Sequence, residues 1–330
     1  MLRHVGFALA ALICTNASLV SAQQPAELTV YTYDSFATEW GPGPALKAGF
    51  EQSCGCTVTF ESSEDAISTL RKLQLEGAAS PADVILGLDT ATYGEARRTG
   101  LIAPHGLDLP ELAIAWDDAD FVPFDYGYFA YVYNTETVPN PPTSFEELIA
   151  LPDSFKVVIQ DPRSSTPGLG HVLWVQLAYG ERAPEIWAGL RPHILTITRG
   201  WSDAYSLFLA GEADMVLSYT TSPAYHAIAE EDDRFAFAEF SEGYVPQVEV
   251  AGVTASSDQP ELAREFLAFL VSEEAQRIIP TTNWMYPVRD IGDALPAAFG
   301  TPPQNIIAVD EQVVHENAGA WVDAALAALR

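Results

Sequence analysis

Short apolar runs rich in β-branched and aromatic residues alternate along this chain with longer amphipathic stretches. The runs have the length and composition of buried strands and occupy residues 28–33, 82–88, 155–159, 215–219 and 248–253. The clearest helical pattern begins near Asp258, a candidate N-cap with Glu261 three residues later, and its apolar face contains Leu262, Phe266, Phe269 and Leu270. Regular alternation of strands and helices predicts α/β lobes with largely parallel sheets.

Two segments are expected to cross between lobes. Residues 121–133, too long and aromatic for an ordinary turn, would carry the chain out of a first lobe, and residues 243–250 would bring it back. We therefore assign residues 27–124 and 247–330 to lobe I and residues 125–246 to lobe II. A chain that leaves one α/β lobe and returns to it encloses a hinged cleft, and open α/β sheets bind ligands at the carboxyl ends of their strands.

The N-terminus has the three parts of a secretory signal peptide. A basic start with Arg3 precedes an apolar run from Val5 to Cys14, and a small-x-small pattern ends at Ala22. A membrane anchor is the alternative, but the apolar run is about half of the ~20 residues that a spanning helix needs. We expect residues 1–22 to be removed on export, to the periplasm in a bacterium with two membranes.

Composition limits the class of protein and its partners. The chain is 48% hydrophobic and 11% aromatic, which excludes disorder, and its length suits two domains of roughly 150 residues. Loss of Arg3 with the signal peptide would leave 15 basic and 45 acidic residues, a net charge of −30. Such a charge repels nucleic acids and anionic membranes and attracts cations.

Cysteine usage fits an exported protein. Cys14 would leave with the signal peptide, so that only Cys54 and Cys56 remain. An oxidising compartment favours a disulfide between them, which would close a small ring and add modest stability. A redox role is the alternative, and two thiols are too few for a structural zinc site.

Two kinds of segment carry candidate binding chemistry. Hydroxyls that open a helical pattern, with Arg163 nearby, could hold an anion, because N-terminal amides lack partners; these are Ser164, Ser165 and Thr166. Ordinary capping by one hydroxyl is the alternative. Turn-like segments offer aromatic faces that attract cations and stack on flat rings, although each aromatic could equally belong to a core: Trp201, Tyr219, Tyr225 and Trp284.

Sequence motifs of enzymes are missing. Residues 200–204 depart from the G-x-S-x-G elbow at their last position, and the sequence contains no Walker loop, dinucleotide fingerprint or H-E-x-x-H motif. The histidines are scattered without ligand spacing. The sequence therefore favours a binding protein with no catalytic residues, no metal site and no cofactor.

Several of these segments together resemble the periplasmic thiamine-binding proteins of thiamine ABC importers, from about residue 27 to about 290. The similarity is carried by LTVYTYDSFATEWGPGP, ADVILGLD, FVPFDYGYFAYVY, QDPRSSTPGLG, GWSDAYSLFLAGEADMVLSYTTSPAYH and NWMYPV. The resemblance implies a two-lobed type II periplasmic binding protein fold that closes on thiamine, thiamine monophosphate or thiamine diphosphate and delivers it to the importer's membrane subunits. We expect a monomer.

The resemblance also implies roles for individual residues. Tyr33 and Asp65 match contact positions on the first lobe, and Trp284 matches the tryptophan that covers the pyrimidine. Matching cleft aromatics on the second lobe are Trp201, Tyr219 and Tyr225, and the phosphate segment corresponds to Ser164, Ser165 and Thr166. Asp65 would accept from the aminopyrimidine or offset the charge of the thiazolium ring.

Two other functions stay open at this point. A binding protein of the same fold for ferric iron could use Tyr219 and Tyr225, and one for polyamines would need several carboxylates around the aromatics. An exported enzyme that processes thiamine would need a nucleophile, and the only thiols are Cys54 and Cys56, which we expect to be paired.

Overall fold

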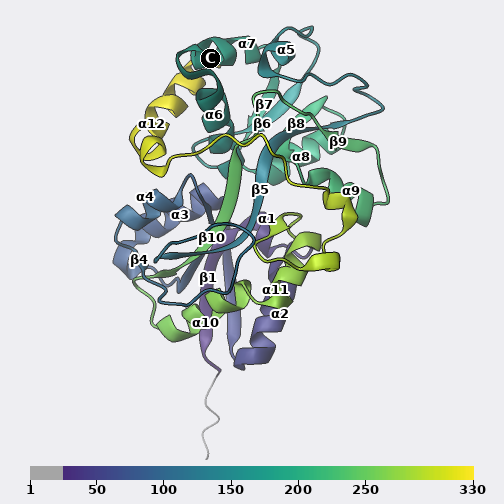
Figure 1. The fold of residues 1–330 in the computed structure, drawn as a ribbon. Coiled ribbons are helices and arrows are strands. Elements are labelled where there is room, and N and C mark those ends of the chain that lie inside the picture. The colour runs from purple at the N-terminus through teal and green to yellow at the C-terminus, as the bar shows by residue number, and fades with distance from the viewer. Residues whose placement is uncertain (1–24) are drawn as a thin grey trace, which may run out of the picture.

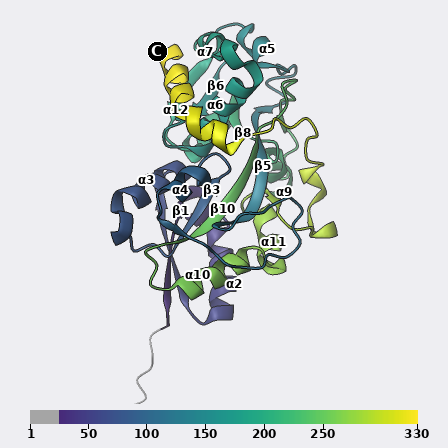
Figure 2. The same ribbon diagram turned by 60° about the vertical axis from the view of Figure 1, so that its left-hand side comes forward.

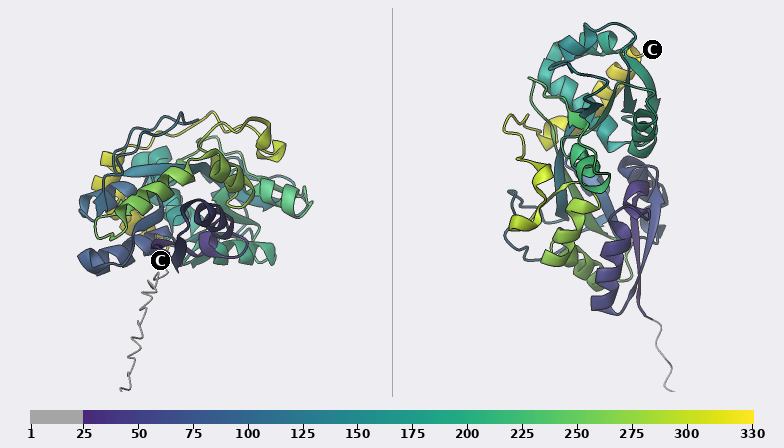
Figure 3. Two further views of the ribbon diagram at one scale, coloured as in Figure 1. Left: turned by 90° about the horizontal axis from the view of Figure 1, so that it is seen from below. Right: turned by 90° about the vertical axis from the view of Figure 1, so that its right-hand side faces the viewer.

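The computed structural model describes residues 25–330, so the predicted signal peptide and its cleavage site lie outside the described residues. Two lobes are stacked along the long axis of the molecule (Figure 1). The first strand, β1 (Glu27–Tyr33), begins at the far end of one lobe, and the C-terminus lies on the other (Figure 3, right). Among the described residues, no helix combines the length and apolar character needed to cross a membrane.

One sheet passes through both lobes. Its strand order is β2-β1-β3-β10-β5-β8-β6-β7. After β1, the strands of this path are β2 (Thr57–Ser63), β3 (Val84–Asp89), β5 (Phe121–Asn134), β6 (Val157–Gln160), β7 (Ile194–Thr198), β8 (Met215–Tyr219) and β10 (Pro246–Thr254). Short strands pair at its side: β4 (Ile102–Ala103), β9 (Phe235–Phe237) and β11 (Tyr286–Pro287).

The prediction of largely parallel sheets is right for the outer strands and wrong for the middle of the path. β1 is parallel to β2 and β3, and β6 is parallel to β7 and β8. β5 and β10 run antiparallel to each other, and β10 is antiparallel to β3. The reason is that these two strands are the crossings themselves: β5 leaves the first lobe and β10 returns to it (Figure 2). The sequence indicated both crossings.

Helices pack against the sheet in both lobes. In and around the first lobe they are α1 (Asp34–Ala37), α2 (Gly43–Cys54), α3 (Ala66–Glu76), α4 (Tyr93–Arg98), α10 (Pro260–Leu270) and α11 (Glu273–Ile278). In and around the second lobe they are α5 (Phe145–Ile149), α6 (Thr166–Tyr179), α7 (Ala183–Leu190), α8 (Trp201–Leu209), α9 (Ser222–Ala229) and α12 (Glu311–Ala328).

The predicted N-cap of one helix is wrong by one residue. α10 begins at Pro260, its N-cap is Gln259, and Asp258 does not cap it. Proline suits the first helical position because its fixed φ matches the helix and its missing N–H needs no partner there. The predicted apolar face is confirmed by Phe266 and Leu270, which are buried in the first-lobe core.

The C-terminal helix corrects the predicted extent of lobe I. α12 packs against α6 and α7 of the second lobe, and Figure 1 shows it beside α6. Its apolar residues Trp321, Val322 and Ala325 join the second-lobe core. The chain reaches this position alongside Tyr244, whose backbone bonds to Asn305 and Ile307. Residues after the second crossing therefore do not all belong to the first lobe.

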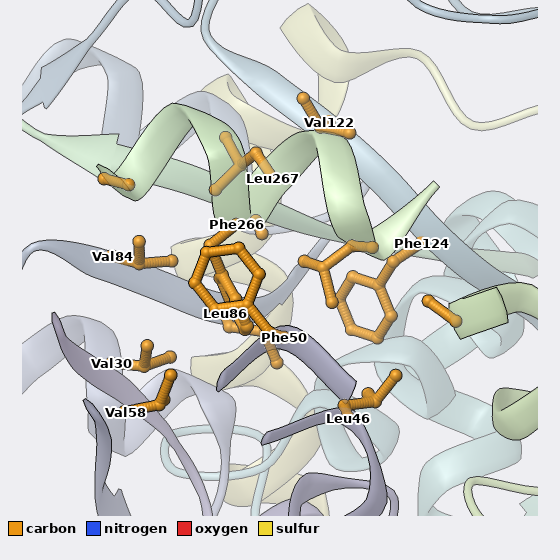
Figure 4. Close-up of a cluster of buried hydrophobic side chains, with 14 of the residues drawn as sticks. Val30, Leu46, Phe50, Val58, Val84, Leu86, Val122, Phe124, Phe266 and Leu267 are labelled. Atoms are coloured by element: carbon orange, nitrogen blue, oxygen red, sulfur yellow. The ribbon is translucent and has the colours of Figure 1, made fainter. Parts of the chain in front are cut away.

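Each lobe has its own apolar core. Figure 4 shows the first, in which side chains from β1, β3, β5, α2 and α10 interlock around Phe50 and Phe266, whose ring centroids lie 5.1 Å apart. The second is built around the fully buried Trp174 of α6, whose ring centroid lies 4.9 Å from that of Phe145 and 5.4 Å from that of Phe240. Separate cores allow the two lobes to be rigid units joined by β5 and β10.

Cys54 and Cys56 form the disulfide that the sequence favoured, with Cα atoms 5.2 Å apart. The pair closes the turn between α2 and β2, and Gly55 between them adopts φ +65°. Glycine pays no steric penalty in this left-handed conformation, which ends α2.

Candidate functional site

A cavity of about 550 Å³ lies where the ends of β1, β3 and β8 meet the starts of α3, α6 and α8 and the segment before β11. Its wall includes all of the aromatic and acidic candidates proposed from the sequence: Tyr33, Asp65, Trp201, Tyr219, Tyr225 and Trp284. The wall formed by the described residues includes two carboxylates, Asp65 and Glu249, and no Lys, Arg or His side chain. The cavity is thus aromatic and acidic.

Tyr33 reaches the cavity because the neighbouring strand carries a glycine. A Cβ added to Gly87 of β3 would lie 2.4 Å from the Tyr33 ring, and Gly87 has φ +99°. The ring therefore lies directly against the backbone of β3. Its hydroxyl donates to Glu249 Oε2 at 2.8 Å, which fixes the ring's orientation.

Two pairs of aromatic side chains form part of the cavity wall. One pair lies on α8 of the second lobe, and the other joins α9 to the segment before β11. Trp201 stacks on Tyr205 with centroids 4.7 Å apart, and its Nε1 donates to Ser218 Oγ at 2.8 Å. Tyr225 meets Trp284 edge to face at 5.2 Å. Such held rings offer faces for stacking on a flat ligand and for attracting a cation.

Trp284 is held in an unusual backbone conformation. Its φ is +59°, a value that bulky residues rarely adopt, and only Glu231 shares a positive φ among the described non-glycine residues. Strained positions of this kind cluster at functional sites, where the surrounding structure enforces them. The role that the resemblance implies for Trp284 stays a prediction, and this conformation is a reason to test it.

Asp65 caps helices from both lobes. As the N-cap of α3 it accepts from the Ala66 amide at 2.7 Å, and across the cleft it accepts from Ser165 Oγ at 2.8 Å and the Thr166 amide at 3.1 Å. Burial raises the pKa of Asp65, although these hydrogen bonds and one from the Trp201 amide lower it. Its oxygens are therefore occupied by helix N-termini, where the amides favour an anion. We call this arrangement the Asp65 cap.

The Asp65 cap changes how the predicted phosphate residues can act. Ser164 does not line the cavity, and its hydroxyl donates to the Arg199 carbonyl at 2.7 Å. Ser165 is buried and its hydroxyl is taken by Asp65. Thr166 does line the cavity, and its buried hydroxyl has no partner among the described residues. Of the three predicted phosphate residues, Thr166 is therefore the one that lines the cavity with a hydroxyl that no described residue engages.

The cavity wall at β10, together with the strands on either side of it, contains acids that the sequence analysis did not single out. Glu249 on β10 lies directly across from Asp89 on β3 and Asp125 on β5, so that three buried acids stand side by side on adjacent strands. We call these residues the carboxylate row. Asn283 donates to Asp125 Oδ2 at 2.7 Å, and Gln247 donates to Glu249 Oε1 at 2.9 Å. The other oxygen of Asp125 is buried without a partner among the described residues.

Ionising all three acids of the carboxylate row at once would be energetically unfavourable. Burial raises the pKa of Asp89 to about 7, and it also raises the pKa of Asp125 to about 7. Burial raises the pKa of Glu249 well above its usual range, and the nearby charge of Asp125 adds to this effect. Like charges opposed across strands are destabilising, and groups perturbed in this way mark functional sites.

The tyrosines considered for iron are already engaged by neighbours. Tyr219 donates to Gln247 Oε1 at 2.9 Å, and Tyr225 donates to Glu230 Oε1 at 2.9 Å. Burial raises the pKa of Tyr219 well above its ordinary value, which disfavours the tyrosinate form. Within residues 25–330, no three or more His, Cys, Asp or Glu side chains are grouped to hold a metal ion.

Comparison with known proteins places this chain. Residues 32–277 match the family model described as bacterial extracellular solute-binding protein. The chain is 50% identical over 299 residues to the thiamine-binding periplasmic protein of Escherichia coli strain K12, covering 89% of this chain and 91% of that one. It is 46% identical over 312 residues to the thiamine-binding periplasmic protein of Brucella abortus, covering 93% of each.

The fold is also that of a solved relative. A structure titled periplasmic thiamin binding protein matches with a TM-score of 0.90 and 48% identity, covering 94% of this chain and 98% of that chain. The arrangement is the two-lobed α/β fold of type II periplasmic binding proteins, as the sequence predicted. The long match of the family model and the high identity to its relatives show that this chain belongs to the bacterial extracellular solute-binding proteins.

Proposed function

We propose that this protein captures thiamine in the cavity between its lobes. The observation that carries the proposal is the cavity wall, which combines stacked aromatic rings with carboxylates and contains no basic side chain among the described residues. Relatives that are 46–50% identical over most of the chain are named thiamine-binding periplasmic proteins. As a member of this family, the chain is a binding protein and not an enzyme.

The wall fits the two rings of thiamine. Thiamine carries a permanently charged thiazolium ring and a flat aminopyrimidine, and aromatic faces serve both. Each cation–π contact contributes about 0.5–2 kcal/mol, more when it is desolvated. Tyr225, from the second lobe, and Trp284, from the segment before β11, meet edge to face and would form one continuous aromatic surface against which a ligand ring stacks.

The phosphorylated forms are a finer part of the proposal. Because Asp65 occupies the Thr166 amide and the Ser165 hydroxyl, a phosphate at those two groups would require the carboxylate to move away. Thr166 supports capture of thiamine monophosphate or diphosphate with Asp65 in place, because it lines the cavity and a rotation of its side chain would turn the unpartnered, buried hydroxyl toward a phosphate.

The names of the relatives support a periplasmic location for this chain. We infer that a monomer delivers its ligand to the membrane subunits of an ABC importer, as solute-binding proteins of this kind do. Asp65 contacts both lobes, so lobe closure would shape the surface that the importer recognises.

Calorimetry tests the proposal directly. The ligands are thiamine, its two phosphates, spermidine and ferric citrate, each titrated into the protein without its signal peptide. We expect sub-micromolar to micromolar affinity for thiamine and much weaker binding of spermidine and iron. Absence of binding to all three thiamine forms would overturn the proposal, whereas a tyrosinate absorption band with iron would favour iron capture. Turnover of thiamine diphosphate would show an enzyme instead.

A further inference from the structure

The carboxylate row presents an acid to the cavity that no positive side chain neutralises. Glu249 lines the cavity, whereas Asp125 and Asp89 flank it on the neighbouring strands β5 and β3. A buried carboxylate is costly unless it is paired, and opposed acids increase the cost. The fold keeps this unfavourable arrangement at the strands that join the lobes.

Geometry distinguishes Glu249 from Asp65, the other acid in the wall. Both oxygens of Asp65 are held by hydroxyl and amide donors that open three helices. Glu249 instead accepts from Tyr33 and Gln247, neither of which is charged. A ligand cation would therefore meet an unneutralised acid at Glu249 and an already capped acid at Asp65.

Asp125 gives the second, independent observation. Its side chain is fully buried, and Oδ1 has no hydrogen-bond partner among the described residues. Asn283, which also lines the cavity, donates to its other oxygen and to the Tyr33 hydroxyl at 3.1 Å. This connects Asp125 to the cavity wall through one side chain.

We propose that Glu249 is the residue that selects a cationic ring, and that the Glu249–Asp125 pair releases a proton to solvent when the cation binds. This inference rests on the proposed capture of thiamine and identifies the part of the ligand that the row recognises. Without ligand, a shared proton keeps two adjacent buried acids from both being charged. With the cation beside Glu249, its single positive charge takes the place of the proton's, so that both acids can be ionised and the proton is released.

The groups that surround the pair come from every neighbouring element. Asp89 faces Glu249 from β3, Tyr33 from β1, and Asp65 acts on it from the start of α3. Tyr219 of β8 reaches it through Gln247. All of these groups are acidic or neutral, so none replaces the positive charge of a ligand.

The test compares thiamine with 3-deazathiamine, a neutral isostere in which carbon replaces the charged ring nitrogen. We expect Glu249→Gln to weaken thiamine binding about 10–100-fold, the effect of losing a charge-assisted contact, and to change 3-deazathiamine binding less than about 3-fold. Glu265→Gln removes the same charge from an exposed position on α10 and is the control.

Proton release is measured by calorimetry in buffers with different ionisation enthalpies at pH 7. We expect the wild type to release a fraction of a proton with thiamine and none with 3-deazathiamine. Asp125→Asn should abolish the release while it leaves Glu249 in place, and the affinity for thiamine should then no longer rise from pH 6 to pH 8.

The outcomes separate the two proposals. If the wild type binds neither compound, the proposed function fails and this inference fails with it. If it binds both with equal affinity, or if Glu249→Gln weakens both equally, thiamine capture stands and the role of the row is overturned. Binding of thiamine without any buffer-dependent heat would overturn the proton release alone.

Discussion

The cavity wall contains two carboxylates, Asp65 and Glu249, and the fold surrounds them in opposite ways. Asp65 accepts hydrogen bonds from the starts of α3 and α6, with the Trp201 amide at the start of α8 also contributing. Glu249 stands between Asp89 and Asp125, and burial raises its pKa well above the usual range. Asp65 thus connects the two lobes through hydrogen bonds, whereas Glu249 has no positively charged partner among the described residues. Burial alone therefore does not tell a structural acid from a ligand-binding one.

Replacing each acid by its amide tests most directly whether Asp65 and Glu249 differ in their contribution to stability. Asp65→Asn places an NH₂ group against helix amides and leaves at least one donor unpaired, which should lower the free energy of unfolding by about 2–4 kcal/mol. Glu249→Gln relieves like-charge repulsion and should leave stability unchanged or higher at pH 8. Denaturant unfolding without ligand measures both. Equal destabilisation by the two substitutions would show that Asp65 and Glu249 have the same structural role.

Substitutions of Trp284 test the aromatic part of the cavity wall. Trp284→Ala and Trp284→Gly should each weaken thiamine binding by about 1–3 kcal/mol, because a central aromatic anchor is lost. Glycine accepts the +59° φ of this position without strain. Trp284→Gly should therefore unfold at a temperature at least as high as Trp284→Ala, which reverses the usual order of these residues.

A higher melting temperature for Trp284→Ala would contradict the strain argument. Undiminished calorimetric affinity in both variants would remove Trp284 from the site. Val313→Ala changes an exposed apolar residue on α12 and serves as the control for unspecific effects.

Stability of the unliganded protein should fall as pH rises through the range in which the row ionises. The pKa of Asp125 is raised to about 7 in the folded protein, compared with about 4 in an unfolded chain. The folded state therefore binds more protons than the unfolded state between these values, so that raising the pH favours unfolding. From pH 5 to pH 7 we expect a loss of about 1–2 kcal/mol.

Global repulsion among the acids of the chain also weakens the protein as pH rises, so variants are needed to isolate the row. Asp125→Asn should flatten the pH dependence of denaturant unfolding, and Glu265→Gln should not. Saturating thiamine should flatten it as well, because the cation replaces the proton. Parallel curves for wild type and Asp125→Asn would show that the row does not titrate in this range.

Local patterns in the sequence predicted most of the fold, and the family resemblance supplied the candidate site residues. The strand and crossing segments were visible as apolar runs. Of the residues that the resemblance assigned, the six aromatic and acidic ones and Thr166 line one cavity, whereas Ser164 and Ser165 do not. The carboxylate row escaped prediction because it depends on the register of β3, β10 and β5, which are far apart in sequence. A signal was present: Glu249 interrupts the apolar run 248–253, and an acid in a buried strand indicates a special site.

The C-terminal helix shows a second limit. Its periodicity indicates a helix, but nothing local indicates which lobe covers its apolar face. Only the three-dimensional path, in which residues 305–307 pass beside Tyr244, places Trp321 and Ala325 in the second core. The misplaced start of α10 differs, because Pro260 was a local signal that outweighed the candidate cap at Asp258.

The smallest expected effect concerns the proposed binding of a phosphate by Thr166, beside the Asp65 cap. Thr166→Val removes the free hydroxyl and keeps the shape of the side chain, so thiamine itself should bind as before. Thiamine monophosphate and diphosphate should lose about 0.5–1.5 kcal/mol, the usual worth of one hydrogen bond. Thr220→Val removes another buried, unpartnered hydroxyl, one that does not line the cavity, and is the matched control. If Thr166→Val weakens all three ligands equally, the hydroxyl shapes the cavity and does not read phosphate. If it weakens none, the phosphate group binds elsewhere. The N-termini of α3 and α6 then serve to bind the carboxylate of Asp65 and not a ligand phosphate.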